Sequence, residues 1–449
     1  MSITLCLSFQ EIPVNLRQKK NDMKAMYASL AAMTIALAAC STSTKEIEEE
    51  KNVIHLAEAI DNPVKMNLSE IVDSIVFIPI SSKEEFIRDP QLMSYSKPYL
   101  MVYPRCIFNM KGEFVGYLGS IGQGPGEECN IDGYSNYYDE QQNKFYTRGY
   151  KIIQFDENRK FTGKEVQITY RDKTNGDKLT KGLSSPYTFL RSGKYNVVIN
   201  FPDSAFWMDE DLRIVKKERL IPEDLFSNSP GGRISMPYTF STNNDTTIFF
   251  NCFTDKLYSV TEDGINERWK IDIGRNRADN RCFLNYEKEL IEDEMAKIVR
   301  SSSGDPSSMK IIAENSKLAK LIDGKKWIGR AWETARYVMM HWKDLLAFHD
   351  FRTGKNLTYW AVYDKRTKEP KADSYLKYDM DGCVDFSPSE AIIGINDGVL
   401  MTAAWPYAVY SYVHRKKEKG EPEDPRLEEL LVDYDEEDNP ILVLAYLKK

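Results

Sequence analysis

The sequence predicts an all-β fold of the β-propeller type, and three observations support this prediction. The chain of 449 residues is rich in aromatic residues, with 26 Tyr, 20 Phe and 7 Trp, which favour strands. Alternating apolar runs recur along it at a regular spacing, each interrupted by a polar turn. Strand-like segments also stand near both ends of the globular part.

The recurring unit is a strand, a polar turn and a second strand. The first four turns begin near residues 109, 156, 209 and 261, which is a period of roughly 50 residues. A small sheet of this kind cannot bury both faces alone, so successive units must stack around an axis. A fifth turn begins near residue 364, about twice the period further on. The turns are Asn109–Gly112, Asp156–Asn158, Asp209–Asp211, Glu262–Gly264 and Asp364–Thr367.

The chain ends also fit a closed ring. Ile75–Ile80 is an early apolar run and Ile441–Leu447 is a late one. We expect them to pair within one blade, because this pairing removes the open edge that a ring of sheets would otherwise expose.

The long gap before the fifth turn predicts a helical insertion at about 284–325. Apolar residues recur there at helical spacing in two stretches, and Ser301–Pro306 separates them. This helical hairpin would either cap one face of the propeller or fill a groove between blades. The apolar residues are Leu290, Ile291, Met295, Ile298, Val299, Ile311, Ile312, Leu318 and Leu321.

The N-terminal region predicts export. Lys19, Lys20 and Lys24 precede an uncharged apolar stretch that is too short for a stable bilayer span. Leu37–Cys40 resembles the bacterial lipobox, in which the cysteine receives a lipid; a buried helix with a chance cysteine is the alternative. We therefore expect a signal peptide at 1–39, with 1–22 as an over-extended start. A lipidated, acidic tether at 40–51 and the propeller at 52–449 follow.

Composition narrows the classes of partner. The net charge is −8 and the isoelectric point is about 5.4, which argues against nucleic acid. The cysteines after Cys40 are odd in number and scattered, so the sequence predicts isolated buried thiols rather than a zinc site or a disulfide framework. They are Cys106, Cys129, Cys252, Cys282 and Cys383.

The segment Phe114–Glu127, which contains the run Gly-Gln-Gly-Pro-Gly-Glu, resembles a signature of the six-bladed β-propeller lipoproteins common in Bacteroidota. The ending Glu437–Leu442 and the lipobox resemble that family too. Glu128 and Cys129 stand where the family usually has an aromatic residue. The resemblance covers roughly residues 52–449 and implies six blades, but it names no substrate.

Two local motifs favour structural roles. Gly122–Gly126 is not followed by Lys-Ser/Thr or by an amphipathic helix, so it predicts a tight connection leaving the first blade; a small anion-binding nest is the alternative. Asp379–Glu390 has a calcium-loop outline but has Val384 where the sharp-turn glycine is needed. We therefore predict a solvated turn there.

No catalytic constellation stands out in the sequence, and we predict no metal and no cofactor. The sequence has no Gly-x-Ser-x-Gly elbow, and the spacing of its histidines shows no shared face with a third ligand. The histidines are His55, His341, His349 and His414.

Aromatic and arginine residues near strand ends are the better candidates for ligand binding, because loops converge around a propeller axis. Their rings stack on sugars or other flat groups, and guanidinium groups pair with carboxylates; packing between blades is the alternative. The candidates are Tyr103, Arg105, Arg148, Trp332, Trp342 and Trp405.

The sequence therefore predicts an outer-membrane lipoprotein, facing the periplasm or the cell surface, that binds a glycan, a peptide or a protein without catalysis. The membrane is its partner through the lipid, and its oligomeric state stays open. An alternative is a glycan lyase or hydrolase with a site in the central channel. A structural subunit of a membrane complex is a third possibility.

Overall fold

The computed structural model describes most of the chain from Asn52 onward. The chain divides into two compact units, Met1–Val53 and Ile54–Lys449. Apart from Asn52 and Val53, the residues that the structure describes belong to the second unit. The signal peptide, Cys40 and the tether lie outside the described residues. The described residues are 52–83, 85–87, 93–96, 98–102, 105–128, 135–148, 151–167, 170–171, 179–180, 188–200, 204–220, 238–243, 246–280, 324–344, 358–373, 376–377, 380, 392–420, 425–432, 434–435 and 437–449.

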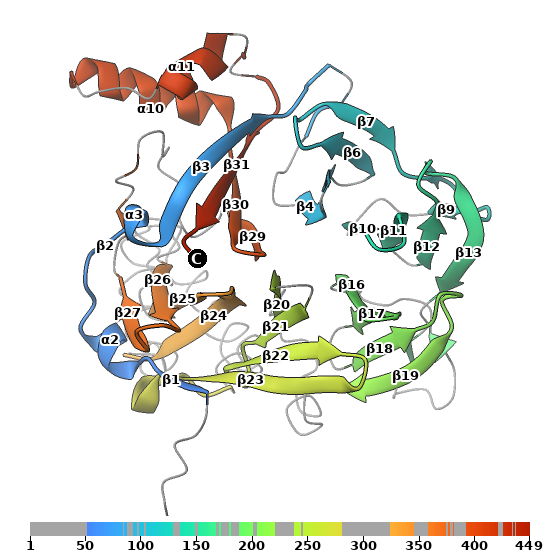
Figure 1. Ribbon diagram of the computed structural model, residues 1–449, viewed down its shortest axis with the longest axis horizontal. Coiled ribbons are helices and arrows are strands. Elements are labelled where there is room, and N and C mark those ends of the chain that lie inside the picture. Colours follow the sequence, from blue (N-terminus) through green and yellow to red (C-terminus); the bar gives the residue numbers. More distant parts are fainter. Residues whose placement is uncertain are drawn as a thin grey trace, which may run out of the picture. The chain divides into compact units, whose positions relative to one another are not determined.

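Within the described residues, six sheets of four or five strands form the six blades of a β-propeller, which confirms the predicted fold class (Figure 1). In blades 1 to 5 consecutive strands of the chain pair with one another. Blade 1 has β4 (Met93–Ser96), β5 (Tyr99–Val102), β6 (Cys106–Asn109) and β7 (Phe114–Tyr117). Blade 2 has β10 (Ser135–Asp139), β11 (Lys144–Arg148), β12 (Lys151–Phe155) and β13 (Phe161–Gln167). Blade 3 has β16 (Thr188–Ser192), β17 (Tyr195–Asn200), β18 (Ser204–Met208) and β19 (Ile214–Arg219). Blade 4 has β20 (Tyr238–Asn243), β21 (Thr246–Asn251), β22 (Lys256–Thr261), β23 (Gly264–Asp272) and the added β1 (Val53–His55). Blade 5 has β24 (Lys326–Glu333), β25 (Tyr337–Asp344), β26 (Tyr359–Asp364) and β27 (Glu369–Ala372). Blade 6 has β29 (Ile392–Asn396), β30 (Val399–Ala404), β31 (Ile441–Leu447) and β3 (Val72–Pro79).

The middle strands of the blades are buried on both faces, because each blade packs between two neighbours. Thr247–Asn251 of β21 and Ile441–Ala445 of β31 are each five consecutive buried residues. Such strands lose the strict alternation of a half-exposed sheet. The largest apolar cluster joins blades 3, 4 and 5 and includes Trp207, Phe250 and Ile328.

The two ends of the propeller pair in blade 6, as the sequence predicted. β3 and β31 are antiparallel, with Ile78 opposite Leu442 and Ile75 opposite Ala445. The last strand of the chain thus lies between the first long strand and β30. This arrangement closes the ring without leaving an open edge between the last blade and the first.

The five polar turns found in the sequence all join the third and fourth strands of a blade. They follow β6, β12, β18, β22 and β26 in blades 1 to 5. Blade 6 has no such turn, because its fourth strand, β3, comes from the other end of the chain. Six blades therefore produce only five visible turns. The spacing before the fifth turn is doubled because a long connection follows β23, before the first strand of blade 5.

Four of these turns use the same side-chain chemistry. The Asp156 carboxylate accepts the backbone N–H groups of Asn158 (2.9 Å) and Lys160 (2.8 Å). Asp209 makes the same pair of bonds, with the N–H groups of Asp211 and Arg213. An acceptor side chain that bonds its own backbone two residues on stabilises a tight turn. Asn109 and Asp364 occupy the equivalent positions.

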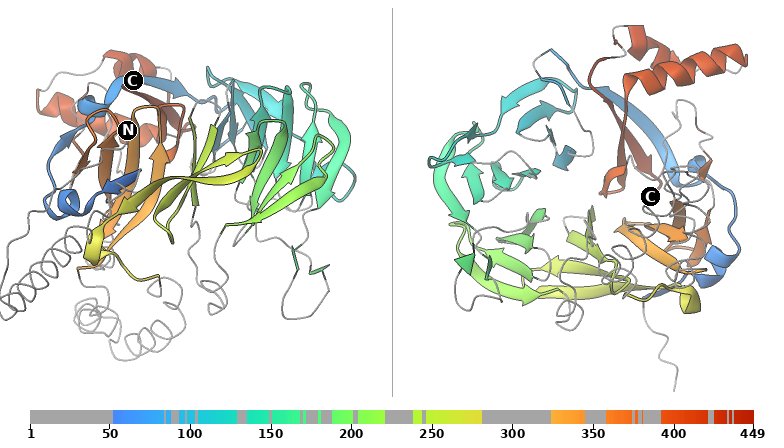
Figure 2. Two further views of the ribbon diagram at one scale, coloured as in Figure 1. Left: turned by 60° about the horizontal axis from the view of Figure 1, so that its bottom comes forward. Right: turned by 180° about the vertical axis from the view of Figure 1, so that it is seen from behind.

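The two faces of the ring carry different connections. Because neighbouring strands are antiparallel, one face carries the turns between first and second strands and between third and fourth strands, and we call it the turn face. The other carries the links between second and third strands and between blades, and we call it the connection face. Seen from the side in Figure 2, the strands of blades 1 to 3 stand next to one another between these two faces.

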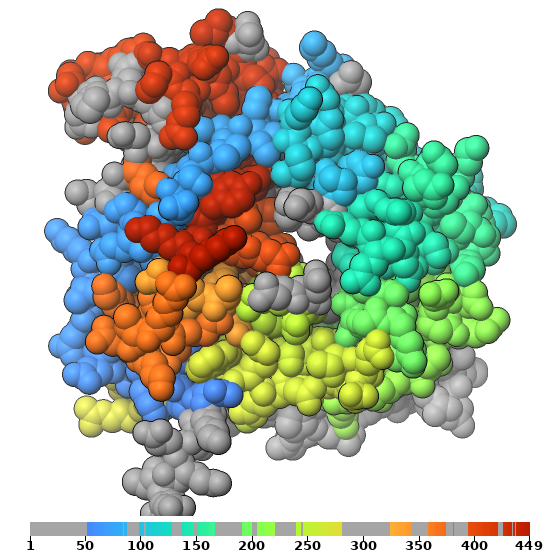
Figure 3. Space-filling view, viewed as in Figure 1, coloured from blue at the N-terminus to red at the C-terminus, as the bar shows by residue number. Residues whose placement is uncertain are grey.

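The middle of the ring is lined by the first strand of each blade. A space-filling view shows an opening there, between atoms of blades 2 and 6 (Figure 3). At the turn face the backbone N–H of Thr242 donates to Asn396 Oδ1 (3.1 Å), and the N–H of Asp397 donates to the Thr242 carbonyl (2.8 Å). Blades 4 and 6 are therefore linked directly.

The N-terminal segment runs along the outer edges of blades 4, 5 and 6. The Leu56 N–H donates to the Asp272 carbonyl in blade 4, and the Val64 N–H donates to the Ala372 carbonyl in blade 5. This segment thus covers sheet edges that would otherwise present unpaired backbone groups. Its elements are β1, α2 (Ala57–Asp61), β2 (Met66–Asn67) and α3 (Leu68–Ile71); β2 pairs in parallel with β28 (Leu376–Lys377).

The remaining described elements are short pairs and peripheral helices. The helices α10 and α11 lie outside β3 and β31 in Figure 1. The expected helical insertion at 284–325 falls almost entirely on residues outside the described part; only Gly324 and Lys325 are described, directly before β24. The elements are β8 (Ser120–Ile121) with β9 (Glu127–Glu128), β14 (Tyr170–Arg171) with β15 (Leu179–Thr180), η2 (Gly274–Asn276), α10 (Pro406–Glu418) and α11 (Pro425–Val432).

Candidate binding site at the rim of blades 6 and 1

The predicted ligand-binding residues separate into a core group and a surface group. Trp332 and Trp342 are only 2% and 4% exposed. The Trp332 ring lies 4.8 Å from the His341 ring, and the Trp342 Nε1–H donates to the Trp360 carbonyl (3.2 Å). Both tryptophans are therefore packed within the blades and do not form part of a surface site.

Three of the other predicted residues, Arg105, Arg148 and Trp405, lie at strand ends of the connection face. Arg105 precedes β6, and Trp405 follows β30. Arg148 is the last residue of β11, and its side chain is outside the described part. Tyr103, in the link between β5 and β6, is also outside the described residues. Arg105 and Trp405 are therefore the two that the structure can place in a site.

Arg105 is held by its own blade. Its Nη1–H donates to the Gly119 carbonyl (2.9 Å), and its guanidinium lies over the Tyr117 ring, 5.1 Å from the ring centre. The Leu118 N–H in turn donates to the Arg105 carbonyl. A guanidinium stacked on a ring is preorganised for planar acceptors such as carboxylates.

Tyr117 connects this arginine to the loop that enters blade 1 from blade 6. Its hydroxyl donates to Glu85 Oε2 at 2.6 Å. This hydrogen bond is the main reason that the pKa of Tyr117 lies above its ordinary value. Phe86 follows Glu85 in the chain and is 54% exposed. Its ring centre lies 6.4 Å from that of Trp405, at an angle of 33°.

These five residues form the candidate site, which we call the rim site: Glu85, Phe86, Arg105, Tyr117 and Trp405. They come from three separate stretches of the chain and meet where blade 6 passes into blade 1. Arg105 and Trp405 were predicted from the sequence, and the other three residues were not. The only sequence signal for Tyr117 is that it belongs to the segment that carries the family resemblance.

A buried asparagine fixes the loop that presents Glu85 and Phe86. The Asn439 Nδ2–H groups donate to the carbonyl oxygens of Ser81 and Glu85, both at 2.7 Å. Its Oδ1 accepts the Ile87 N–H at 2.6 Å. Asn439 is fully buried and directly precedes the last strand. The segment that closes the propeller therefore also positions the rim site.

The glycine-rich run that follows Tyr117 is held by two carboxylates of this chain. The Gly124 N–H donates to Glu127 Oε2 (2.9 Å), and the Gly126 N–H donates to Glu165 Oε2 (2.8 Å). Both N–H groups, which could have bound an external anion, thus hold carboxylates of this chain. This finding favours the predicted structural connection over the anion-binding nest.

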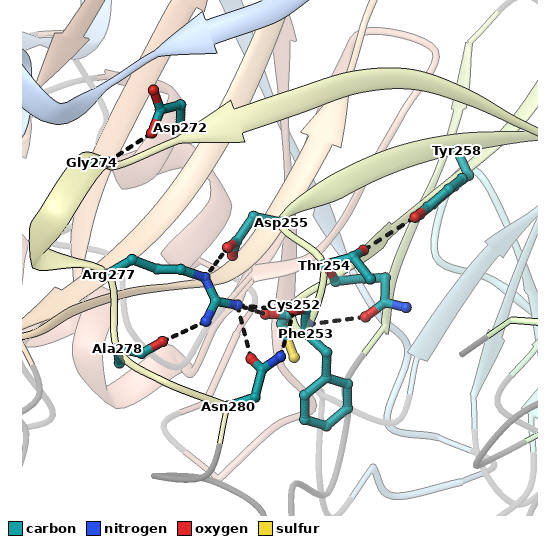
Figure 4. Close-up of polar contacts among 11 residues, drawn as sticks. Cys252, Phe253, Thr254, Asp255, Tyr258, Asp272, Gly274, Arg277, Ala278 and Asn280 are labelled. Carbon is teal, nitrogen blue, oxygen red and sulfur yellow. Dashed lines mark hydrogen bonds and ion pairs between the residues drawn. The ribbon is translucent and has the colours of Figure 1, made fainter. Parts of the chain in front are cut away.

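A second polar cluster on the connection face surrounds Arg277 (Figure 4). Its guanidinium donates to Asp255 and to the carbonyls of Phe253 and Ala278, and it also bonds Asn280. Burial raises the pKa of the Asp255 carboxyl to about 6, and the Arg277 charge opposes this shift. Because the arginine is saturated by this chain, the cluster fastens the β21–β22 turn to the segment after β23 and offers little to a ligand.

The described histidines and cysteines do not form a reactive group. His341 is buried between the Trp332 and Trp360 rings, and burial holds its pKa well below the ordinary value. Cys106 and Cys252 are free and buried, as predicted for isolated thiols, and burial raises the pKa of Cys106 to about 11.

The described residues contain neither a metal-binding group nor a membrane-spanning helix. Among the described residues, no group of three or more His, Cys, Asp and Glu side chains is placed to hold a metal ion. Within that same part of the chain, no helix combines the length and the apolar character needed to cross a membrane. Asp379–Glu390, the calcium-like segment, lies outside the described residues, except for Met380.

A family model described as a domain of unknown function, DUF4934, matches residues 51–446. The chain belongs to this family. The match covers the whole propeller, including Arg105 and the closing segment around Asn439. None of the curated proteins in the comparison matches the chain.

Solved structures place the DUF4934 chain among propellers. A protein of Bacteroides fragilis, named as exported, aligns with a TM-score of 0.57 and 16% identity, over 88% of this chain and 100% of its own. BamB from Moraxella catarrhalis aligns with a TM-score of 0.34 and 10% identity, over 83% and 100% of the two chains. Streptogramin B lyase has a TM-score of 0.31 and 9% identity, over 73% and 94%. At these identities the likeness concerns the fold alone, and the last two scores support no argument.

Proposed function

We propose that this DUF4934 protein is a lipid-anchored protein of the cell envelope whose propeller binds a partner at the rim site without catalysing a reaction. The observation that carries the proposal is the exposure of that site. Phe86 is 54% exposed and Tyr117 is 41% exposed, beside a half-buried Trp405. Exposed apolar side chains that gather on one surface mark interaction sites.

The polar groups of the rim site support binding rather than chemistry. The Glu85 carboxylate is paired with the Tyr117 hydroxyl, and Arg105 is paired with the Gly119 carbonyl. The Glu85–Tyr117 pair places a hydroxyl beside a carboxylate, but their hydrogen bond raises the pKa of Tyr117, which opposes activation of this hydroxyl as a nucleophile. Arginine, tyrosine and tryptophan are instead the side chains that contribute most of the energy at binding interfaces.

Export and anchoring rest on the N-terminal sequence and on one similar protein. The lipobox-like run Leu37–Cys40 follows a basic and then an apolar stretch, and the protein of Bacteroides fragilis that shares this fold is named as exported. We place the protein in the outer membrane, facing the periplasm or the cell surface. Cys40→Ser should abolish labelling by a fatty-acid analogue and release the protein from the membrane fraction; retention of both would refute the anchor.

A photo-crosslinking experiment tests the binding surface. A benzophenone amino acid is placed at Phe86 or at Trp405 of the full-length chain in intact cells. The matched control carries it at Ile214, which is 48% exposed on blade 3. We expect a discrete crosslinked partner from the rim positions and none from the control. Identical patterns at all three positions would contradict a specific site.

A further inference from the structure

We infer that the rim site recognises an acidic oligosaccharide, in which a sugar ring carries a carboxylate. This inference rests on the proposed function and names the ligand class for the same site. It starts from Arg105, a half-buried guanidinium with five N–H donors. Among the described residues, one hydrogen-bond acceptor serves it, the Gly119 carbonyl.

Within the described residues, the other N–H groups of Arg105 stay open to water or to an acceptor group of a ligand. Its stacking on Tyr117 fixes the plane of the guanidinium. A planar guanidinium recognises a carboxylate by two parallel hydrogen bonds, which are stronger than bonds to neutral oxygens. The matching ligand group is therefore a carboxylate.

Glu85 favours the opposite kind of ligand group, a hydrogen-bond donor. Its Oε2 accepts the Tyr117 hydroxyl, and in the described part of the chain its Oε1 has no hydrogen-bond donor. A free carboxylate oxygen selects ligand groups that donate, such as hydroxyls. The site therefore fits a ligand that carries a hydrogen-bond donor for Glu85 and an anionic acceptor for Arg105.

Phe86 supplies the apolar part of the site. Its ring is backed by Trp405 and leaves more than half of its surface open. An exposed ring, a carboxylate oxygen and a guanidinium, the last two with open positions among the described residues, match one sugar unit, which has a C–H face, a rim of hydroxyls and a carboxylate. An acidic peptide supplies the carboxylate and backbone N–H donors for Glu85, but it does not combine them with the flat C–H face that a sugar ring presents to Phe86.

A binding titration with three matched saccharides tests the inference. The probes are an oligogalacturonate, its methyl ester, which removes the charge, and a neutral galactose oligomer of equal length. A hexaglutamate peptide is the fourth probe. The protein is the full-length lipidated chain in detergent micelles. We expect the oligogalacturonate to bind at least tenfold more tightly than the other three probes.

Three variants locate the binding. Arg105→Met and Trp405→Ala should each weaken oligogalacturonate binding at least tenfold, and Arg105→Lys should weaken it as well because the bidentate fork is lost. Arg213→Met, at an exposed arginine on the turn face of blade 3, is the control and should bind normally. Circular dichroism and unfolding midpoints show whether each variant is folded.

The possible failures separate the two proposals. Equal binding of acid and methyl ester, both lost in Trp405→Ala, would overturn the acidic ligand and keep the binding site. Stronger binding of hexaglutamate, dependent on Arg105, would overturn the saccharide. If no probe binds while the Phe86 crosslink still captures a partner, the saccharide is wrong and the proposed function stands. If no probe binds and no crosslink forms, both proposals are refuted.

Discussion

The Tyr117 hydroxyl donates a hydrogen bond of 2.6 Å to Glu85, although the two residues are 32 positions apart in the chain. Tyr117 ends the outermost strand of blade 1, whereas Glu85 lies in the loop that arrives from blade 6. The bond therefore connects the first blade to the last one at the point where the ring closes. As a result, the Glu85 carboxylate and the Arg105 guanidinium of the rim site both contact Tyr117.

Tyr117→Phe should weaken ligand or partner binding without unfolding the protein. Removal of the hydroxyl frees Glu85 but keeps the ring under Arg105. Because one hydrogen bond is lost, we expect binding to fall about threefold to tenfold. Titration with whichever ligand the wild-type chain binds measures this change. Tyr407→Phe, at an exposed tyrosine on α10, is the control, and equal effects of the two variants would rule out a special role for Tyr117.

Asn439→Ala should destabilise the fold and the rim site together. The change removes three hydrogen bonds, two of them to half-buried carbonyls and one to the buried Ile87 N–H. Unsatisfied buried groups of this kind cost roughly 3 kcal/mol in all. Denaturant unfolding of the full-length chain measures the loss.

The control for Asn439 is Asn158→Ala, which removes an exposed contact with Glu157 in a turn of blade 2. It should change the free energy of unfolding by less than about 0.5 kcal/mol. If Asn439→Ala were as mild as this control, the loop from Ser81 to Ile87 would have to be held by other contacts.

The architecture of the propeller could be predicted because local signals repeat. Each of the five turns carries its own acceptor or glycine, as at Asp156 and Gly264, so the turns located blades 1 to 5, the first four of them at a regular period. The closing pair β3 and β31 could be predicted because two long apolar runs need partners. The count of six could not be read from the turns, since the closing blade has none.

Most of the rim site could not be predicted, because it forms only through tertiary contacts. Glu85 and Phe86 stand in an ordinary polar stretch, and their position depends on Asn439, more than 350 residues away. Trp332, Trp342 and Trp405 look alike in the sequence, yet two are core residues and one is at the surface. Strand periodicity does not say which blade covers a given side chain. Helices α10 and α11 were also missed, although Pro406 at the start of α10 is a usual helix-start signal.

His341 should make the propeller less stable in mild acid. Its pKa lies well below 6.5 in the folded state, because burial and the nearby Arg330 and Lys343 disfavour the charged ring. The unfolded chain titrates near the ordinary value of about 6.5 and therefore binds more protons below that pH. The free energy of unfolding should accordingly fall by about 1 kcal/mol for each pH unit below about 6, until the folded-state pKa is reached.

His341→Phe should remove this part of the pH dependence. The substitution keeps an aromatic ring between Trp332 and Trp360 and cannot be protonated. Unfolding curves at pH 7 and pH 5 would show a smaller difference for the variant than for the wild type. His55→Phe, at an exposed histidine, should leave the wild-type slope nearly unchanged. If His341→Phe fails to fold, an NMR titration of the His341 imidazole gives the same answer, and a pKa near 6.5 would contradict the prediction.

Gly122 and Glu127 should be coupled energetically. A Cβ at position 122 would lie 2.0 Å from Glu127 Oε2, so Gly122→Ala must displace the carboxylate from the Gly124 N–H. We expect a loss of about 1 kcal/mol, the net value of one such bond. In a Glu127→Ala background the same glycine substitution should cost much less, because the obstructing carboxylate is gone. A double-mutant cycle on unfolding free energies measures this difference. Additive effects would mean that the Glu127 carboxylate does not hold the turn, and the Gly124 N–H would again be available to an external anion.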